Sequence, residues 1–290
     1  MAKVGIIGGT GLEQALLSEG EGNQVDIDTP FGKPSCPLVE TNWHGCDIAI
    51  LNRHGQGHLI PPGSINYRAN IYALKSVGCT HIIASGAVGS LQEEIEPKQI
   101  VIPDQVIDKT FRRIPTFFDD IAAHVDFSSP FCSILRGHLL SCADSVETVV
   151  HDGGTYVCME GPAFSTRAES EMHRMWGAQL IGMTVMPEAK LAREAEIAYA
   201  LVAIPTDYDC WKPAPADLDA HELIAEIFGN LKEATASAVA LIRTAIERFG
   251  QVADTPSPAH SSLELAIFSD RSLFTPEIMS RLSLFLNKYN

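Results

Sequence analysis

The chain has 290 residues, 46% of them hydrophobic and 20% charged, which excludes an intrinsically disordered chain and allows one large domain or two ordinary ones. The formal net charge of −15 argues against nucleic acid as a partner, because binding to phosphate backbones needs a basic surface. Apolar runs are of strand length, and the Met-Ala-Lys start lacks the apolar core of a signal peptide. We therefore expect a cytoplasmic protein with no membrane partner.

The seven cysteines are scattered, with no C-x-x-C motif and no Cys/His cluster at zinc spacing. They are typical of small buried thiols in a reducing compartment, and no metal site is predicted from them. In so acidic a chain, an anionic ligand has to be held by a few local cations and by backbone amides.

Strand and helix patterns alternate along most of the chain. Strands are expected at residues 3–8, 37–41, 47–51, 81–84, 100–103, 155–159, 180–183 and 198–204, and helices at 66–77, 130–143, 165–176, 187–196 and 216–249. This alternation has no composition shift in the middle. It predicts a single α/β domain, residues 1–250, with a mixed central β-sheet flanked by helices.

The remaining residues, 251–290, are predicted to be a linker followed by a C-terminal helical extension. Residues 251–262 are rich in Pro, Ser and Ala, and a helix is expected to start at Thr275-Pro276. We expect Leu282, Leu284 and Phe285 to be exposed on this helix and to suit a subunit contact. The extension would pack on the same domain or on a neighbouring subunit.

The first candidate for anion binding is the loop Gly8-Gly9-Thr10-Gly11, which directly follows a strand. Its amides and the Thr10 hydroxyl could surround an anion, although a tight turn without a ligand explains the pattern equally well. The loop lacks the G-x-G-x-x-G spacing of a dinucleotide site and is not a Walker A loop.

Donors also follow three later strands. Arg53 and His54 come directly after one strand, and an Arg at a strand end presents a planar fork that matches phosphate, although a surface ion pair is the alternative. Small residues from Ser85 to Ser90 follow another strand and would let a ligand approach the backbone. Thr184 follows a third strand at a helix entrance, while Met183 beside it is explained at least as well by core packing.

Two carboxylates, Asp207 and Asp209, lie at the end of the apolar strand 198–204. Because residues two apart on an extended chain point to the same face, both side chains should project together past the sheet edge. Two neighbouring carboxylates raise one pKa, which leaves a proton available near neutral pH. An exposed acidic turn that caps the next helix is the alternative.

Taken together and in order, these motifs resemble the methylthioadenosine phosphorylases of the trimeric purine nucleoside phosphorylase family. The resemblance runs from about Lys3 to Phe249 and rests on Gly-Gly-Thr-Gly-Leu at 8–12, Arg-His-Gly at 53–55, Asn-Tyr-Arg-Ala-Asn at 66–70, Met-Glu-Gly-Pro at 159–162 with Phe164, Met183-Thr184 with Pro187-Glu188, and Thr-Asp-Tyr-Asp-Cys-Trp at 206–211. The combination is far more specific than any one motif.

The resemblance implies a nucleoside phosphorylase-like fold and a pentosyltransferase of purine and methionine salvage. Such an enzyme splits S-methyl-5'-thioadenosine with inorganic phosphate, as a co-substrate, into adenine and S-methyl-5-thio-α-D-ribose 1-phosphate. It needs no metal or organic cofactor and works as a homotrimer.

The resemblance also implies residue roles. The family's phosphate ligands fall on Thr10, Arg53, His54, the Ala87 amide and Thr184, with Gly86 at a position where relatives often carry a Thr, so that Ser85 is a candidate replacement. Met183 and Phe164 fall on nucleoside contacts, Asp207 and Asp209 on the catalytic base-reading pair, and His124 on a residue that reaches a neighbouring subunit's pocket. Ala163 and Gly182 replace larger polar residues of some members.

The Asp pair favours a 6-amino purine, because relatives that take 6-oxo purines use an Asn that can donate to the oxygen. An ungapped match places Ala220, Leu223 and Ile224 around the 5' group as an apolar wall, with His221 beside them. A methylthio group fits such a wall. A broader nucleoside phosphorylase for adenosine, inosine or methylthioinosine is the alternative if His221 enters the pocket.

Two alternatives come from other functional classes. An NAD-binding oxidoreductase would use the Gly8-Gly9-Thr10-Gly11 turn, but it lacks an acidic ribose reader and leaves the Arg53-His54 and Asp207-Asp209 pairs without a role. An inactive nucleoside sensor is suggested by Gly86. Phosphate-dependent release of free adenine distinguishes all three.

Overall fold

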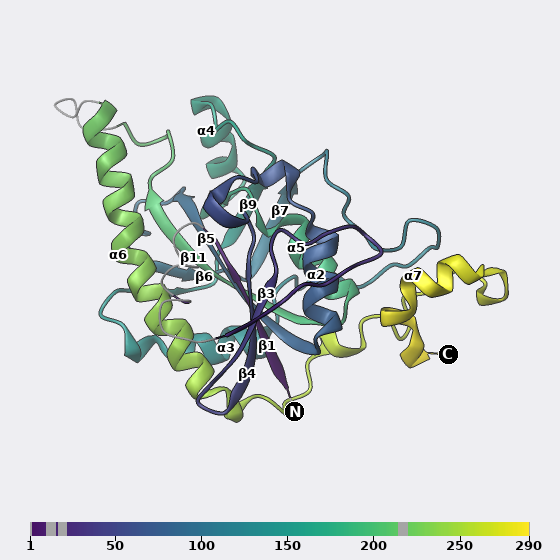
Figure 1. Cartoon of the computed structure of the whole chain (residues 1–290). Helices are drawn as coiled ribbons and strands as arrows, with labels where there is room; N and C mark the ends of the chain where they lie inside the picture. The colour runs from purple at the N-terminus through teal and green to yellow at the C-terminus, as the bar shows by residue number, and fades with distance from the viewer. Residues whose placement is uncertain (1, 10–15, 17–21, 214–219, 290) are drawn as a thin grey trace.

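The computed structural model describes residues 2–9, 16, 22–213 and 220–289. A mixed eleven-stranded sheet forms the centre of this part of the chain (Figure 1). The strands are β1 (Lys3–Gly8), β2 (Asn23–Val25), β3 (Leu38–Trp43), β4 (Cys46–Asn52), β5 (Cys79–Ser90), β6 (Ile100–Ile102), β7 (Gln105–Lys109), β8 (Val150–Asp152), β9 (Thr155–Met159), β10 (Leu180–Gly182) and β11 (Ala198–Asp207). Their order is β2-β3-β4-β1-β5-β10-β9-β7, with β11 pairing with β5 and β6, and β6 with β8. The predicted α/β fold with a mixed sheet is confirmed.

Strand β5 is twice as long as β1 and joins three neighbours, β1, β10 and β11. The sequence predicted a loop from residue 85 onward, and this is wrong. Gly86 and Ala87 pair in register with Ala203 and Ile204 of β11, so these small residues extend the strand. The end of β5 therefore runs beside the end of β11.

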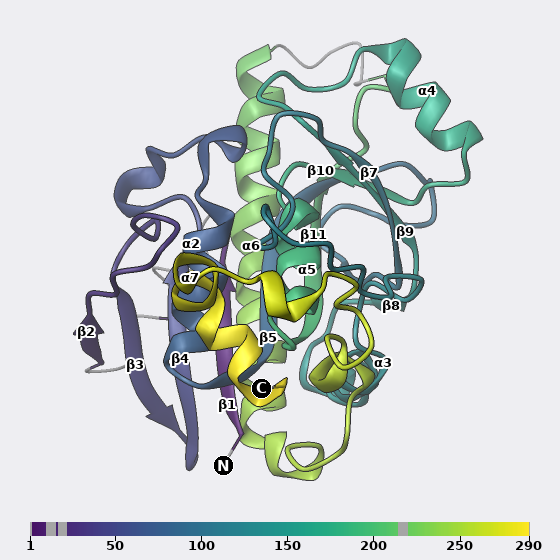
Figure 2. The ribbon, with the colours of Figure 1, turned by 90° about the vertical axis from the view of Figure 1, so that its right-hand side faces the viewer.

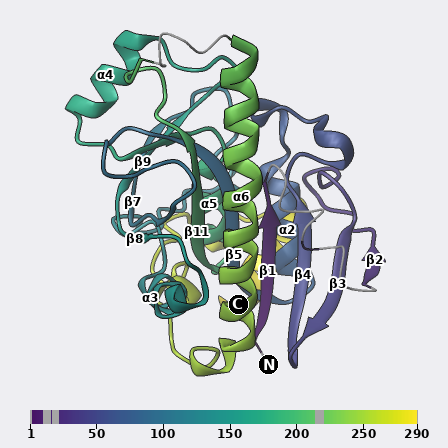
Figure 3. The same cartoon turned by 90° about the vertical axis from the view of Figure 1, so that its left-hand side faces the viewer.

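Helices cover both faces of the sheet (Figures 2 and 3). They are α2 (Tyr67–Ser76), α3 (Ser133–Ser141), α4 (Arg167–Met175), α5 (Val185–Glu194), α6 (Ala220–Glu247) and α7 (Pro276–Leu286). The side chains of β11 alternate between the two cores, with Tyr199 and Leu201 packing in the core that includes α2, α5 and α7, and Ala200 and Val202 in the core that includes α3 and α6. This period of two explains why the strand is apolar at every position from 198 to 205.

Local capping sets the helix ends that the sequence predicted. The Asn66 side chain accepts the Ala69 N–H at the start of α2, and Gly78, at φ +90°, follows its end. Thr166 and Glu169 form a capping box at the start of α4. Thr275 caps α7, as expected from the Thr-Pro-Glu sequence.

The C-terminal helix α7 packs against its own chain. Leu282 is 0% exposed and Phe285 is 3% exposed, and the Phe285 ring contacts Phe117 and Tyr72. The expectation that Leu282 and Phe285 are exposed is therefore wrong. Hydrophobic burial within one chain already covers this face of the helix.

Among the described residues, no helix combines the length and the apolar character that a membrane crossing requires. All seven cysteines lie in the described part of the chain, and none of them forms a disulfide.

Candidate active site

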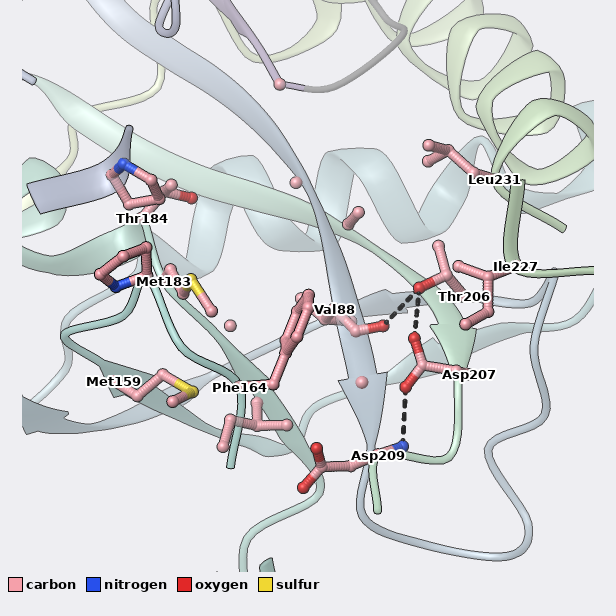
Figure 4. A pocket seen from close by; sticks show the side chains of 18 of the residues that line it. Val88, Met159, Phe164, Met183, Thr184, Thr206, Asp207, Asp209, Ile227 and Leu231 are labelled. Atoms are coloured by element: carbon pink, nitrogen blue, oxygen red, sulfur yellow. Dashed lines mark hydrogen bonds between the residues drawn. The ribbon is translucent and has the colours of Figure 1, made fainter. Parts of the chain in front are cut away.

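A cavity of about 400 Å³ lies where the ends of β5 and β11 meet (Figure 4). Its described lining comes from segments that are far apart in sequence: Gly9, Arg53, His54, His58, Pro62, Gly86, Ala87, Val88, Gly89, Met159, Pro162, Phe164, Ile181, Gly182, Met183, Thr184, Thr206, Asp207, Asp209, Ile227, Phe228 and Leu231. The sheet thus brings nine of the predicted site residues to one cavity: Arg53, His54, Gly86, Ala87, Phe164, Met183, Thr184, Asp207 and Asp209.

Arg53 anchors one end of the cavity. Its guanidinium is fully buried and forms a bidentate ion pair with Glu188, with Nε–Oε2 at 2.6 Å and Nη2–Oε1 at 2.8 Å. Nη1 donates to the Ser85 carbonyl at 3.0 Å, and Tyr199 donates to Glu188 at 2.8 Å. These bonds use three of the five guanidinium N–H groups, so two are left for a ligand.

Gly9 is required for this arrangement because its backbone passes directly over the β5 backbone. A Cβ at this position would lie 2.8 Å from the Ser85 carbonyl oxygen and 3.4 Å from Nη1 of Arg53. The adjacent Thr10, a predicted phosphate ligand, lies outside the described residues.

His54 has its ring orientation fixed by the backbone. Its Nδ1 lies 2.8 Å from the Ile60 carbonyl, which only accepts, so Nδ1 carries the proton. Burial and the neighbouring Arg53 charge lower the pKa of His54 to about 4, so the ring is neutral at pH 7. A neutral ring with the proton on Nδ1 leaves Nε2 as an acceptor. The ring also stacks on His58, with centroids 4.0 Å apart.

The predicted replacement of a missing phosphate ligand by Ser85 is not supported by the geometry. Ser85 is buried and is not among the described residues that line the cavity. Its hydroxyl accepts the Gly9 N–H at 3.4 Å, and its carbonyl accepts from Nη1 of Arg53. Ser85 therefore supports two residues that line the cavity. At Gly86, the Thr184 hydroxyl is the one neighbour among the described residues within 4 Å of an added Cβ, at 3.6 Å.

Gly182 is small because a tyrosine occupies the space beside it. A Cβ at Gly182 would lie 2.0 Å from the Tyr156 hydroxyl oxygen and 2.7 Å from its Cζ. The buried Tyr156 hydroxyl also hydrogen-bonds with the backbone of Thr184. Gly182, which replaces a larger polar residue of some family members, is therefore matched by Tyr156, whose side chain supports the cavity wall at Thr184.

Asp207 ends β11 and faces the cavity (Figure 4). Thr206 Oγ1 donates to its Oδ2 at 2.7 Å, and the Asp209 N–H donates to its Oδ1 at 2.8 Å. Burial raises the pKa of Asp207 and the Asp209 charge raises it further, while both hydrogen bonds oppose the shift. The net shift is upward, as the sequence predicted.

Asp209 reaches the cavity by a different route from the one predicted. It lies beyond β11 in a turn with φ +51°, a left-handed conformation that is uncommon for residues other than glycine. Its carboxylate points away from that of Asp207 (Figure 4). The alternation of an extended strand therefore does not explain the pair.

Apolar side chains form the rest of the wall. Phe164 is 84% exposed at the cavity and Met183 lies deeper, beside Met159. From α6 come Ile227, Phe228 and Leu231, which lie about one turn beyond the apolar wall that the sequence predicted.

Of the predicted wall residues, the structure describes the side chain of Ile224. Ile224 is 53% exposed and is absent from the described lining, as is the exposed His221. The side chains of Ala220 and Leu223 lie outside the described part. The apolar spacing of 224, 227, 228 and 231 was a signal that could have found the observed wall.

His124 does not line the cavity of its own chain as far as the structure describes it. Its backbone donates to the Ala266 carbonyl at 2.8 Å, and its exposed ring packs against Phe268, with centroids 5.4 Å apart. A role in a neighbouring subunit's pocket stays a prediction.

Comparison with known proteins agrees with this geometry. The model of the phosphorylase superfamily matches residues 3–247. The chain is 45% identical to the S-methyl-5'-thioadenosine phosphorylase of Geobacter sulfurreducens, over 99% of this chain and 98% of that protein. The corresponding protein of Thermosynechococcus vestitus is also 45% identical, over 99% of both chains. The chain belongs to the S-methyl-5'-thioadenosine phosphorylases of the phosphorylase superfamily.

Solved structures of this family have the same fold. A methylthioadenosine phosphorylase from an Antarctic soil metagenomic library superposes with a TM-score of 0.90 at 43% identity, covering 98% of this chain and 99% of that one. The Schistosoma mansoni methylthioadenosine phosphorylase in complex with tubercidin has a TM-score of 0.82 at 34% identity, covering 93% of this chain and all of that one. The predicted family and nucleoside phosphorylase-like fold are confirmed.

Proposed function

We propose that the cavity carries out the phosphorolysis of S-methyl-5'-thioadenosine to adenine and S-methyl-5-thio-α-D-ribose 1-phosphate. One observation carries this proposal: a single cavity has a buried cation with free donors at one end and a carboxyl group of raised pKa at the other. Phosphate and purine would then bind on opposite sides of the sugar, which is the arrangement that an attack on C1' requires.

The phosphate end is assigned to Arg53, His54, Ala87, Thr184 and Thr10. The two remaining N–H groups of Arg53 donate to phosphate oxygens, as do the Ala87 amide and the Thr184 hydroxyl. Because the Nδ1 proton of His54 is held by Ile60, its Nε2 accepts from the hydroxyl of hydrogen phosphate. Since Glu188 neutralises the Arg53 charge, binding depends on several aligned donors and not on one strong charge.

At the base end, Asp207 acts as the general acid. As the bond between N9 and C1' breaks, its electron pair moves onto the purine and N7 takes the proton of Asp207. A phosphate oxygen then forms the new bond to C1', after passing an oxocarbenium-like sugar that the phosphate charge stabilises. The Asp207 carboxylate left behind keeps its two hydrogen bonds, from Thr206 and the Asp209 amide. Asp209 accepts from the 6-amino group.

The test is phosphate-dependent release of free adenine from methylthioadenosine by the purified protein. Adenine released with phosphate and not without it supports the proposal. Nucleoside binding without release would indicate a sensor, and reduction of a nicotinamide cofactor would indicate an oxidoreductase.

The 5' end is expected to prefer a methylthio group to a hydroxyl. Ile227, Phe228 and Leu231 offer no hydrogen-bond partner, and burying an unpaired hydroxyl costs roughly 1–3 kcal/mol. Methylthioadenosine should therefore exceed adenosine in kcat/KM by about tenfold to a few hundredfold. Competing measurements on the two nucleosides test this.

Two variants on α6 locate the wall. Leu231→Ser is expected to reduce the methylthioadenosine preference, while Ile224→Ser, at an exposed position of the same helix, leaves it unchanged. Equal kcat/KM values for the two nucleosides would instead favour the broader nucleoside phosphorylase. A preference for adenosine that His221→Ala abolishes would do the same.

We propose a homotrimer as the working form, on the basis of the family and of His124, which is not among the described residues that line the cavity of its own chain. If His124 completes a neighbour's pocket, dilution to monomers should abolish activity and not merely reduce stability. Sedimentation and activity measured over the same concentration series test this. A fully active monomer would contradict the trimer.

We also propose that residues 1–250 form the nucleoside phosphorylase domain and that 251–290 are an extension packed on it, working in the cytoplasm. None of the seven cysteines forms a disulfide, which suits a reducing compartment. Removing residues 276–290 should destabilise the protein, because Leu282, Phe285 and Leu286 each contribute about 1.5–3 kcal/mol of burial. Urea unfolding measures this; an unchanged midpoint would show that α7 is dispensable.

A further inference from the structure

Helix α4 has a buried polar side chain for which the phosphorolysis described above has no role. His173 is 1% exposed and, with Ser170, is one of the two buried residues of this nine-residue helix. Within the described residues, its Nδ1 has no hydrogen-bond partner, and the same is true of the buried Oδ2 of Asp209. Buried polar atoms are nearly always paired, so these two unpaired atoms need an explanation.

Several contacts bring α4 onto the turn that carries Asp209. The Cys210 thiol donates to the Ser165 carbonyl, just before the start of α4, at 3.3 Å. The Arg174 guanidinium lies 3.7 Å from the centroid of the Trp211 ring. His173 is on the same helix, and the Asp209 charge acts to raise the pKa of its ring.

The proton on His173 is placed by Lys109 of β7. The Lys109 ammonium has donors alone and lies 2.9 Å from Nε2, so Nε2 accepts and Nδ1 carries the ring proton. Burial and the Lys109 charge outweigh Asp209 and lower the pKa of His173, which keeps the ring neutral. The unpaired nitrogen is therefore a donor, and the unpaired Asp209 oxygen is an acceptor.

We propose that His173 is a positioning residue for Asp209, whose Oδ2 it holds through Nδ1–H, directly or through one shared water. This leaves Oδ1 of Asp209 for the 6-amino group of the purine. The inference rests on the proposed function, because it assigns Asp209 to base recognition.

Two isosteric variants separate this role from simple packing. In His173→Asn the side-chain amide can place an N–H where Nδ1 stands, so the donor to Asp209 is kept and the Lys109 contact is lost. In His173→Gln the amide reaches the position of Nε2, so the Lys109 contact is kept and the donor to Asp209 is lost.

We expect His173→Gln to raise the nucleoside KM by about tenfold to a hundredfold with the phosphate KM unchanged, because one charge-assisted hydrogen bond is lost. His173→Asn should stay within about threefold of wild type. In an Asp209→Ser background, His173→Gln should have little further effect, since the partner is already gone.

Equal losses in the Asn and Gln variants, a parallel rise in the phosphate KM, or a full effect of His173→Gln in the Asp209→Ser background would overturn the positioning role. The wild-type protein, assayed alongside, tests the proposed function separately. Adenine release by wild type together with equal losses in the two variants contradicts this inference alone.

Discussion

Asp207→Ala is expected to lower the turnover of methylthioadenosine by about 10²–10⁴-fold, which is the usual contribution of a positioned general acid. Burial and the nearby Asp209 charge raise the pKa of Asp207, which favours the protonated form of the acid, whereas alanine has no proton to supply. Single-turnover kinetics measures the chemical step, and thermal unfolding confirms that the variant is folded. Near-normal turnover would show that another group protonates the purine.

A conservative variant separates proton donation from base recognition at the same position. Asp207→Asn keeps the size of the side chain and offers an N–H donor that suits a 6-oxo group, but its amide cannot give up a proton to the purine. The adenosine-to-inosine ratio of kcat/KM should therefore shift toward inosine. If Asp207→Asn loses activity with no change in this ratio, Asp207 does not read the base.

Arg53→Ala should both destabilise the protein and weaken phosphate binding. The Glu188 carboxylate, which is fully buried, would keep Tyr199 as a partner but lose its counter-charge. Breaking a buried ion pair in this way typically costs about 3–5 kcal/mol. The phosphate KM should rise much more than the nucleoside KM, because the donors of Arg53 face one substrate.

The double variant Arg53→Met with Glu188→Leu separates the two effects. Replacing both members of a buried pair by apolar side chains is often neutral or stabilising, so chemical unfolding should recover most of the lost stability. Phosphate binding should not recover, since its donors are still absent. Recovery of both would show that Arg53 has a structural role and is not a phosphate ligand.

Local sequence determined most of the elements and the side chains near the reaction. The Asn66 and Thr275 caps start their helices through bonds to residues three positions away, which depend on no distant segment. Arg53, Thr184 and Asp207 follow or end strands, and the ends of neighbouring strands meet in one sheet. Their convergence on one cavity could therefore be predicted from pattern and resemblance together.

Tertiary structure decided what these side chains are able to do. Arg53 is paired with Glu188 across 135 positions, and the pairing leaves two donors for a ligand. The space at Gly182 is set by Tyr156, and the apolar wall of the cavity by the rotation of α6, which presents Ile227 and Leu231. Asp209 enters through a left-handed turn instead of a strand. Contacts between distant segments, and the burial that results from them, fix charge, hydrogen bonding and pKa, and no local pattern carries that information.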